Sequence, residues 1–221
     1  MPRRARASVG GVAYHVINRG NGRMRVFHRD GDYAAFVALL EQASQRHPMR
    51  LLAYCLMPSH FHLVLWPQAD GDLSRWMQWL LTAHVRRYHA LRGTSGHVWQ
   101  GRFKAFPIQQ DEHLLTVIRY VERNPLRAGL VRRAQDWRWS SLADDRGRPP
   151  TLLAAWPVDR PRDWRQRVNQ PQTDAELAAV RASVHRGSPF GQDAWRLRTA
   201  VSLGLEASLR PRGRPRREPQ K

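Results

Sequence analysis

Two histidines spaced two residues apart, His60 and His62, are the densest group of reactive side chains in this 221-residue sequence. They stand in an apolar segment, FHLVLW, directly after Pro58 and Ser59. On a β-strand, side chains i and i+2 point to the same face, so both imidazoles can reach one divalent ion while Phe61 enters the core. Imidazole suits a catalytic metal that also holds water or phosphate oxygens. The alternative is that these two of the ten histidines in the chain stand close together without a shared function.

Tyr120 and Asn124 form a second pair, because residues four apart lie on one face of a helix. A tyrosine hydroxyl can attack a phosphodiester and form a covalent phosphotyrosine, although an ordinary pKa near 10 means that it needs help from a metal or a base. Asn124 offers an amide oxygen as a hard third metal ligand. The alternative for Tyr120 is a packing role. The rival tyrosines are Tyr14, Tyr33, Tyr54 and Tyr88, and packing also accounts for Tyr14, Tyr54 and Tyr88.

A compact polar and aromatic stretch at residues 97–104 precedes the segment that carries Tyr120. Here Trp99 could stack on an unpaired base, while Arg102 and Lys104 could contact phosphates. An equally weighted alternative places Trp99 in the core with Arg102 as its solvated neighbour. His15 stands in the first expected strand and is interpreted as a sheet histidine rather than a metal ligand.

The segments that position these residues follow from hydrophobic periodicity and turn residues. They predict strands at 12–18, 51–57, 61–66 and 102–108 and helices at 30–46, 73–92 and 111–124. Pro125 disfavours helical geometry at Asn124, so the third helix is expected to stop there. This order predicts an α+β domain, an antiparallel sheet with helices packed on it. Two short helices are expected further on, near 173–185 and 192–203.

The net charge of the chain indicates which class of partner it binds. The formal charge is +19 and the isoelectric point about 11.6, which favours polyanions. Near the C-terminus, Arg212 and Arg214 lie in a Pro-Arg-Gly-Arg-Pro segment that matches the core of an AT-hook, an extended clip for A·T minor grooves. A single cysteine, Cys55, and the lack of a long apolar run predict an intracellular protein with no membrane partner. No P-loop is present, so no nucleotide cofactor is expected.

Four strings in order, LMPSHFHLVL, HVWQGRFKAFPI, IRYVERNPLRAGLV and WRWSSL, resemble the REP-associated tyrosine transposases of the single-tyrosine HUH (IS200-like) superfamily. The resemblance runs from about Ala13 to Leu142 and implies a ferredoxin-like (RRM-like) HUH fold. It implies that His60 and His62 bind a divalent metal, Mg or Mn, and that Tyr120 is the catalytic nucleophile. The family often has Gln four residues after the tyrosine, where this chain has Asn124, one methylene shorter.

The function implied by the resemblance is a metal-dependent DNA transposase. It would cleave and rejoin single-stranded or hairpin DNA, from repetitive extragenic palindromes, through a 5′-phosphotyrosine. Two alternatives remain open: a domesticated, non-catalytic DNA-binding protein, and a metal-dependent nuclease in which water attacks.

The expected domain organisation is a catalytic domain at 1–143, a linker or wrapping segment at 144–172, a small helical DNA-binding region at 173–209 and an AT-hook-like tail at 210–221. Because the superfamily contains dimers that share active sites and forms that do not, monomer and homodimer both stay open. The expected location is the cytoplasm, in association with the nucleoid.

Overall fold

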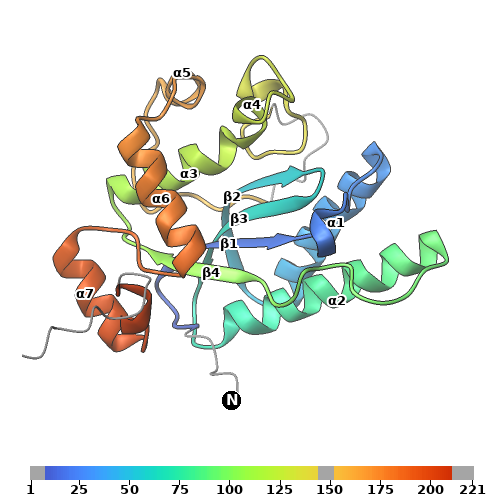
Figure 1. The fold of residues 1–221 in the computed structure, drawn as a ribbon, viewed down its shortest axis with the longest axis horizontal. Helices are drawn as coiled ribbons and strands as arrows, with labels where there is room; N and C mark the ends of the chain where they lie inside the picture. Colours follow the sequence, from blue (N-terminus) through green and yellow to red (C-terminus); the bar gives the residue numbers. More distant parts are fainter. Residues whose placement is uncertain (1–7, 144–151, 211–221) are drawn as a thin grey trace, which may run out of the picture.

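A four-stranded antiparallel sheet forms the centre of the molecule, in the order β2-β3-β1-β4. The structure is a computed structural model that describes residues 8–143 and 152–210. Each strand lies within a few residues of a segment predicted from sequence, and β1 and β3 occupy the two inner positions (Figure 1). The strands are β1 (Ala13–Arg19), β2 (Met49–Met57), β3 (His60–Pro67) and β4 (Lys104–Ile108).

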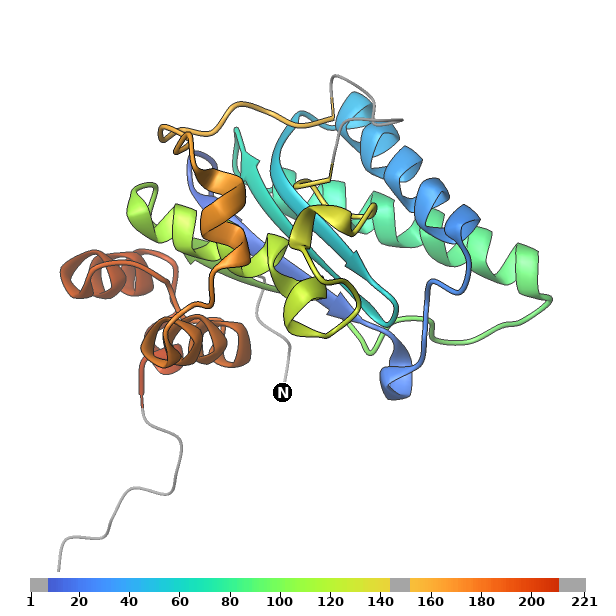
Figure 2. The ribbon, with the colours of Figure 1, turned by 90° about the horizontal axis from the view of Figure 1, so that it is seen from above.

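Two long helices, α1 (Asp30–Arg46) and α2 (Asp72–Arg92), cover one face of the sheet (Figure 2). Their apolar stripes meet the inward side chains of the strands in one buried cluster, which includes Phe36, Phe61 and Trp76. The helix α2 ends where Gly93 adopts a left-handed conformation with φ 60°, which a glycine adopts without steric cost. The predicted α+β architecture is confirmed.

A third helix, α3 (Glu112–Glu122), packs on the opposite face of the sheet and forms a second buried cluster with it. Asp111 caps its first turn by accepting a hydrogen bond from the His113 backbone N–H at 2.9 Å. The helix was expected to run to Asn124, but it ends at Glu122, and a short helix, α4 (Asn124–Arg127), begins at Asn124. Pro125 stands in the first turn of α4, where its missing N–H leaves no hydrogen bond unmade.

Residues 154–186 wrap around this second face (Figure 1). Trp164 begins α5 (Trp164–Asn169), and its indole N–H donates to the buried Glu122 carboxylate of α3 at 2.7 Å. After α6 (Asp174–Arg186), the backbone of Phe190 exchanges hydrogen bonds with Pro107 and Gln109 beside β4, each 2.9 Å. The remaining elements are η1 (Asn21–Arg23), η2 (Ala134–Asp136), α7 (Asp193–Ser202) and η3 (Glu206–Ser208).

The division of the chain at residues 143, 172 and 209 stays a prediction; in the described part of 144–172, Trp164 and Val168 pack in the second buried cluster. In residues 8–143 and 152–210, no helix has both the length and the apolar character that crossing a bilayer requires.

His84 of α2 is a titratable group inside the first cluster. It is 5% exposed, and its ring lies 5.1 Å from the ring of Phe36 and 5.2 Å from that of Trp99. Burial lowers the pKa of His84 from 6.5 to about 4, while Asp32 opposes this shift and Arg87 adds to it. His84 is therefore neutral in the folded protein at neutral pH.

We expect the pH dependence of stability to reveal this residue. Above pH 6.5 the imidazole is neutral in both states, so the full stability is present. As the pH falls from 6.5 towards 4, the unfolded chain binds a proton that the folded chain does not, and stability decreases. His84→Gln should flatten this slope by up to about 1.4 kcal/mol per pH unit in urea unfolding. His28→Gln, at an exposed position, is the control, and equal slopes in the parent and His84→Gln would contradict the assignment.

Candidate active site

His60 and His62 of β3 point to the sheet face that α3 covers. In the register of the sheet, His62 lies opposite Cys55 and His60 opposite Met57, and both of these β2 residues belong to the second cluster. Phe61 points the other way, into the first cluster. The alternation predicted from the His-Phe-His spacing is therefore present.

Both imidazoles already use one ring nitrogen. The Nδ1 atom of His60 lies 3.1 Å from Ser59 Oγ, and the Nδ1 atom of His62 lies 2.9 Å from His15 Nε2. The Nε2 atoms of His60 and His62 are left as the donors that a metal could take. The two ring centroids are 5.1 Å apart. Two imidazoles that share one ion through bonds of about 2.1 Å have centroids about 5 Å apart, so this donor pair fits a divalent metal.

The contact of His15 with His62 was not predicted from the sequence. His15 is fully buried and stacks on His62 at 5.0 Å. It is a sheet histidine, as expected, but its hydrogen bond fixes the orientation of the His62 ring, which is a recognised role for groups behind metal ligands. On β1, His15 lies two residues from both Ala13 and Ile17, so these three side chains share one face of the sheet. That spacing gives its face, but only the pairing of β1 with β3 brings it to His62.

Burial keeps all three imidazoles neutral. It lowers the pKa of His15 to about 3 and, together with the charges of Arg19 and Arg127, lowers the pKa of His60 to about 4. The pKa of His62 lies well below its usual range, mainly because of burial. Neutral imidazole is the form that coordinates metal ions.

Tyr120 of α3 lies against this group of histidines. Its ring stands edge-on to His62 at 5.9 Å and to His15 at 6.3 Å, and the residue is 6% exposed. Among the described residues, its hydroxyl has no hydrogen-bond partner. All five tyrosines of the chain lie in the described part, and the four rivals pack in or against the cluster on the opposite face of the sheet: Tyr14, Tyr33, Tyr54 and Tyr88.

Asn124 and Arg127 of α4 complete the surroundings of Tyr120. The Asn124 side chain is buried, and its Oδ1 accepts a hydrogen bond from Arg127 Nη2 at 2.8 Å. The Arg127 guanidinium also lies over the Tyr120 ring, 4.3 Å from its centroid. An amide oxygen has two lone pairs, so Asn124 Oδ1 retains one for a further partner.

Trp99 does not lie where a base could stack on it. It is 6% exposed and packs in the first cluster, with its ring 5.1 Å from that of Phe61. The predicted stacking role is therefore replaced by the core alternative, because a buried indole face is not available to a ligand.

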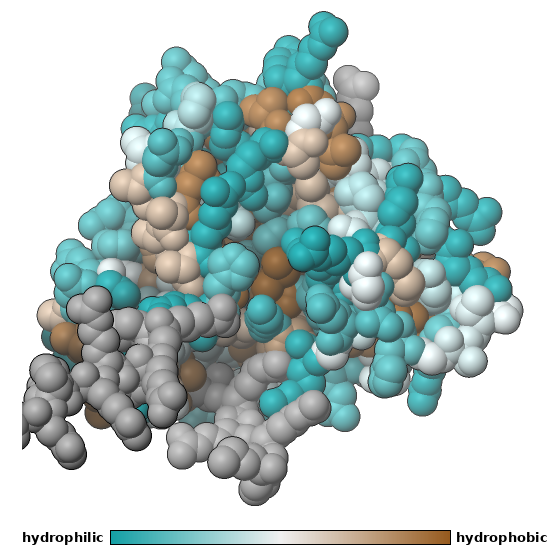
Figure 3. All heavy atoms as spheres, in the orientation of Figure 1, coloured by the Kyte–Doolittle hydropathy of each residue, from teal (hydrophilic) through white to brown (hydrophobic). Residues whose placement is uncertain are grey.

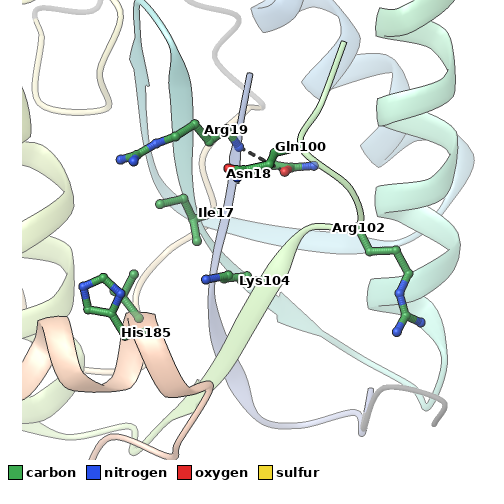
Figure 4. A pocket seen from close by; sticks show the side chains of 8 residues that line it. Ile17, Asn18, Arg19, Gln100, Arg102, Lys104 and His185 are labelled. Atoms are coloured by element: carbon green, nitrogen blue, oxygen red, sulfur yellow. Dashed lines mark hydrogen bonds between the residues drawn. The ribbon is translucent and has the colours of Figure 1, made fainter. Parts of the chain in front are cut away.

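Arg102 and Lys104 are exposed and line a pocket of about 300 Å³ between β1, β4 and α6 (Figure 4). Arg19 and Lys104 project to the side where His185 of α6 lies, whereas Arg102 extends towards α2. Arg19 pairs with His60 in the sheet, so the pocket adjoins the histidines. The remaining lining residues are Ile17, Asn18, Gln100 and Val184.

The face of the molecule seen in Figure 3 is largely hydrophilic, with apolar groups in scattered patches. Arg212 and Arg214, the predicted AT-hook residues, lie outside the described residues.

A second group of potential metal donors, Asp111, Glu112 and His113, lies at the start of α3. Asp111 Oδ1 accepts the His113 backbone N–H at 2.9 Å and lies 2.7 Å from His113 Nδ1. These contacts are those of a helix cap. Eight residues of helix, about 12 Å, separate Glu112 from Tyr120. This group was not singled out from sequence.

Comparisons with known proteins identify the family of the chain. The family model described as "Transposase IS200 like" matches residues 8–124. A putative REP-associated tyrosine transposase of Haemophilus influenzae is 26% identical over 120 residues, which cover 50% of this chain and 68% of the relative. The REP-associated tyrosine transposase of Escherichia coli is 23% identical over 153 residues, 68% of this chain and 84% of the relative.

A solved structure, of a REP-associated tyrosine transposase bound to a REP hairpin, shares the fold. The TM-score is 0.53 at 22% sequence identity, and the match covers 72% of this chain and 94% of that one.

Proposed function

Because the chain belongs to the IS200-like transposase family, we propose that it cleaves and rejoins single-stranded or hairpin DNA through a covalent bond between Tyr120 and a 5′-phosphate. The observation that carries the proposal is the convergence of Tyr120 with His60 and His62 on one face of the sheet. A nucleophile and a pair of metal donors in contact are what a phosphodiester transfer requires.

In the first step the Tyr120 oxygen, having lost its proton, attacks phosphorus and forms a P–O bond. The bond from phosphorus to the 3′-oxygen breaks, and that oxygen takes up a proton. The products are a 3′-hydroxyl end and a 5′-phosphotyrosine. A 3′-hydroxyl on another strand reverses the step and releases Tyr120. One phosphodiester is exchanged for another, so no nucleotide has to supply energy.

The residues that would hold the metal are His60 and His62, each through Nε2, with Asn124 Oδ1 as a further donor. A bound Mg²⁺ or Mn²⁺ would polarise the scissile phosphate and withdraw charge from its oxygens. Ser59 and His15 orient the two imidazoles from behind, since each contacts an Nδ1 atom.

The substrate class follows from the relatives and from charge. Two relatives are named as REP-associated tyrosine transposases, and the solved neighbour holds a REP hairpin. We infer that this chain also takes a hairpin from a palindromic repeat. The strand that leads to the scissile phosphate would follow the basic pocket beside His60, where Arg19 and Lys104 can contact its phosphates. Arg102 would contact the same DNA from the edge of the pocket.

We expect Tyr120→Phe to abolish the covalent protein–DNA adduct while hairpin binding changes little, because only the hydroxyl is removed. The measurement is a denaturing gel of the protein with a labelled hairpin. Tyr33→Phe is a matched control, since Tyr33 is equally buried, at 5%, but lies in the other cluster. An adduct that persists in Tyr120→Phe would mean another nucleophile. Cleavage of DNA by the parent without any adduct would favour a hydrolytic nuclease, and binding alone a non-catalytic protein.

Metal binding should depend on the two histidines of β3. His60→Ala and His62→Ala should each weaken Mn²⁺ binding by about 10-fold or more in calorimetry, and Asn124→Ala should weaken it less. His113→Ala is the control for the alternative donor group at the start of α3. Loss of binding only in His113→Ala would move the metal to that group, and full cleavage in excess chelator would contradict a metal role.

The pocket should contribute to affinity through charge. Arg19→Gln and Lys104→Gln are each expected to weaken binding of single-stranded DNA. They should also reduce the slope of log K against log salt by about 0.7 for every phosphate that the side chain no longer neutralises. Arg46→Gln removes an equal charge from α1, where the guanidinium lies over Trp79, and serves as the control. If all three variants behave alike, only the total charge matters and the pocket has no special part.

A further inference from the structure

The guanidinium of Arg127, in α4, has hydrogen-bond donors of which the folded protein satisfies only some. One guanidinium nitrogen, Nη2, donates to Asn124 Oδ1 at 2.8 Å, and the group lies 4.3 Å from the centre of the Tyr120 ring. The other terminal nitrogen, Nη1, is buried and has no hydrogen-bond partner within residues 8–143 and 152–210. A buried N–H group without an acceptor costs free energy, so this atom is poised for an acceptor that a ligand brings.

The neighbouring arginines are satisfied differently. Arg123, one helical turn earlier, donates to the backbone carbonyls of Val168 and Asn169. Arg119 donates through Nη2 to the carbonyls of Gln170 and Pro171 at 3.0 Å and pairs with Glu176 at 3.9 Å, although its Nε is also buried without a partner among the described residues. Arg127 has no carboxylate within 4.0 Å in residues 8–143 and 152–210. Its positive charge, in contact with Tyr120, therefore lacks an anionic partner among the described residues.

We propose that Arg127 binds the scissile phosphate, with Nη1 donating to a non-bridging oxygen while the ring contact and the Asn124 bond hold the guanidinium beside the nucleophile. This inference rests on the proposed function. During attack, negative charge grows on the phosphate oxygens, and a fixed guanidinium next to them stabilises that charge. The planar group can contact Asn124, the Tyr120 ring and the phosphate at once, which a lysine ammonium cannot do.

This position of Arg127 predicts an effect on metal binding that a purely structural role of Arg127 would not have. A positive charge beside His60 and His62 opposes binding of a bare cation, and an anionic phosphate between them removes the opposition. Arg127→Met should therefore leave Mn²⁺ binding to the DNA-free protein unchanged or tighter, although it impairs DNA cleavage. A residue that only supported the fold of the site would weaken both.

The direct test compares a natural scissile phosphodiester with a methylphosphonate, in which a methyl group replaces one charged oxygen. On the natural linkage, Arg127→Met should slow adduct formation by about 100-fold or more. On the methylphosphonate linkage the same variant should lose much less, because the charge that Arg127 stabilises is absent. Arg127→Lys should recover only part of the rate, and free guanidinium should partly restore Arg127→Ala. Arg123→Met is the matched control and should have the same effect on both linkages.

An equal loss on both linkages, or weaker Mn²⁺ binding in Arg127→Met, would overturn the proposal. The outcome is separable from that of the proposed function. In a Tyr120→Phe background, binding of the two oligonucleotides can be compared without catalysis, and Arg127→Met should lower affinity only for the charged linkage. If the parent forms no adduct, the proposed function fails, while this binding comparison still decides the part of Arg127.

Discussion

The alternation of side chains along β3 is the constraint on which the rest of the structure depends. Because the sheet is covered on both faces, neighbouring residues of this inner strand enter two different cores. Phe61 enters the core of α1 and α2, and the histidines on either side of it enter the space under α3. A shift of one residue in register would bury the imidazoles among aromatic rings and turn Phe61 towards Tyr120, so the packing of both faces holds the chemistry in place.

Putting histidines under a helix has an electrostatic consequence. Burial disfavours the charged form of an imidazole, so His15, His60 and His62 stay neutral and their pKa values lie well below 6.5. Neutral rings can donate lone pairs to a metal and can hydrogen-bond to one another, as His15 and His62 do. The positive charge of the region comes instead from the guanidinium groups of Arg19 and Arg127. This separation of neutral metal donors from fixed cations suits a site that we propose to bind a cation and a phosphate together.

Much of this organisation could be predicted from the sequence because it depends on local spacing. Period two placed His60 and His62 on one face, and hydrophobic patterns located every strand of the sheet to within a few residues. Helical spacing paired Tyr120 with Asn124, and in the structure Arg127 contacts both. The end of α3 was misjudged by two residues, because Pro125 fits the first turn of a new helix as well as it ends an old one.

Only the tertiary structure decided the contacts between residues far apart in the chain. Local periodicity shows which side chains share a face, but not which other element that face meets. The pairing of β1 with β3 joined His15 to His62, the packing of α2 on the sheet enclosed Trp99 against Phe61, and the turn into α4 carried Arg127 over Tyr120. The sequence by itself determined the metal donors and the nucleophile as candidates. Their meeting on one face, and the groups behind them, depended on how two cores packed on opposite sides of one sheet.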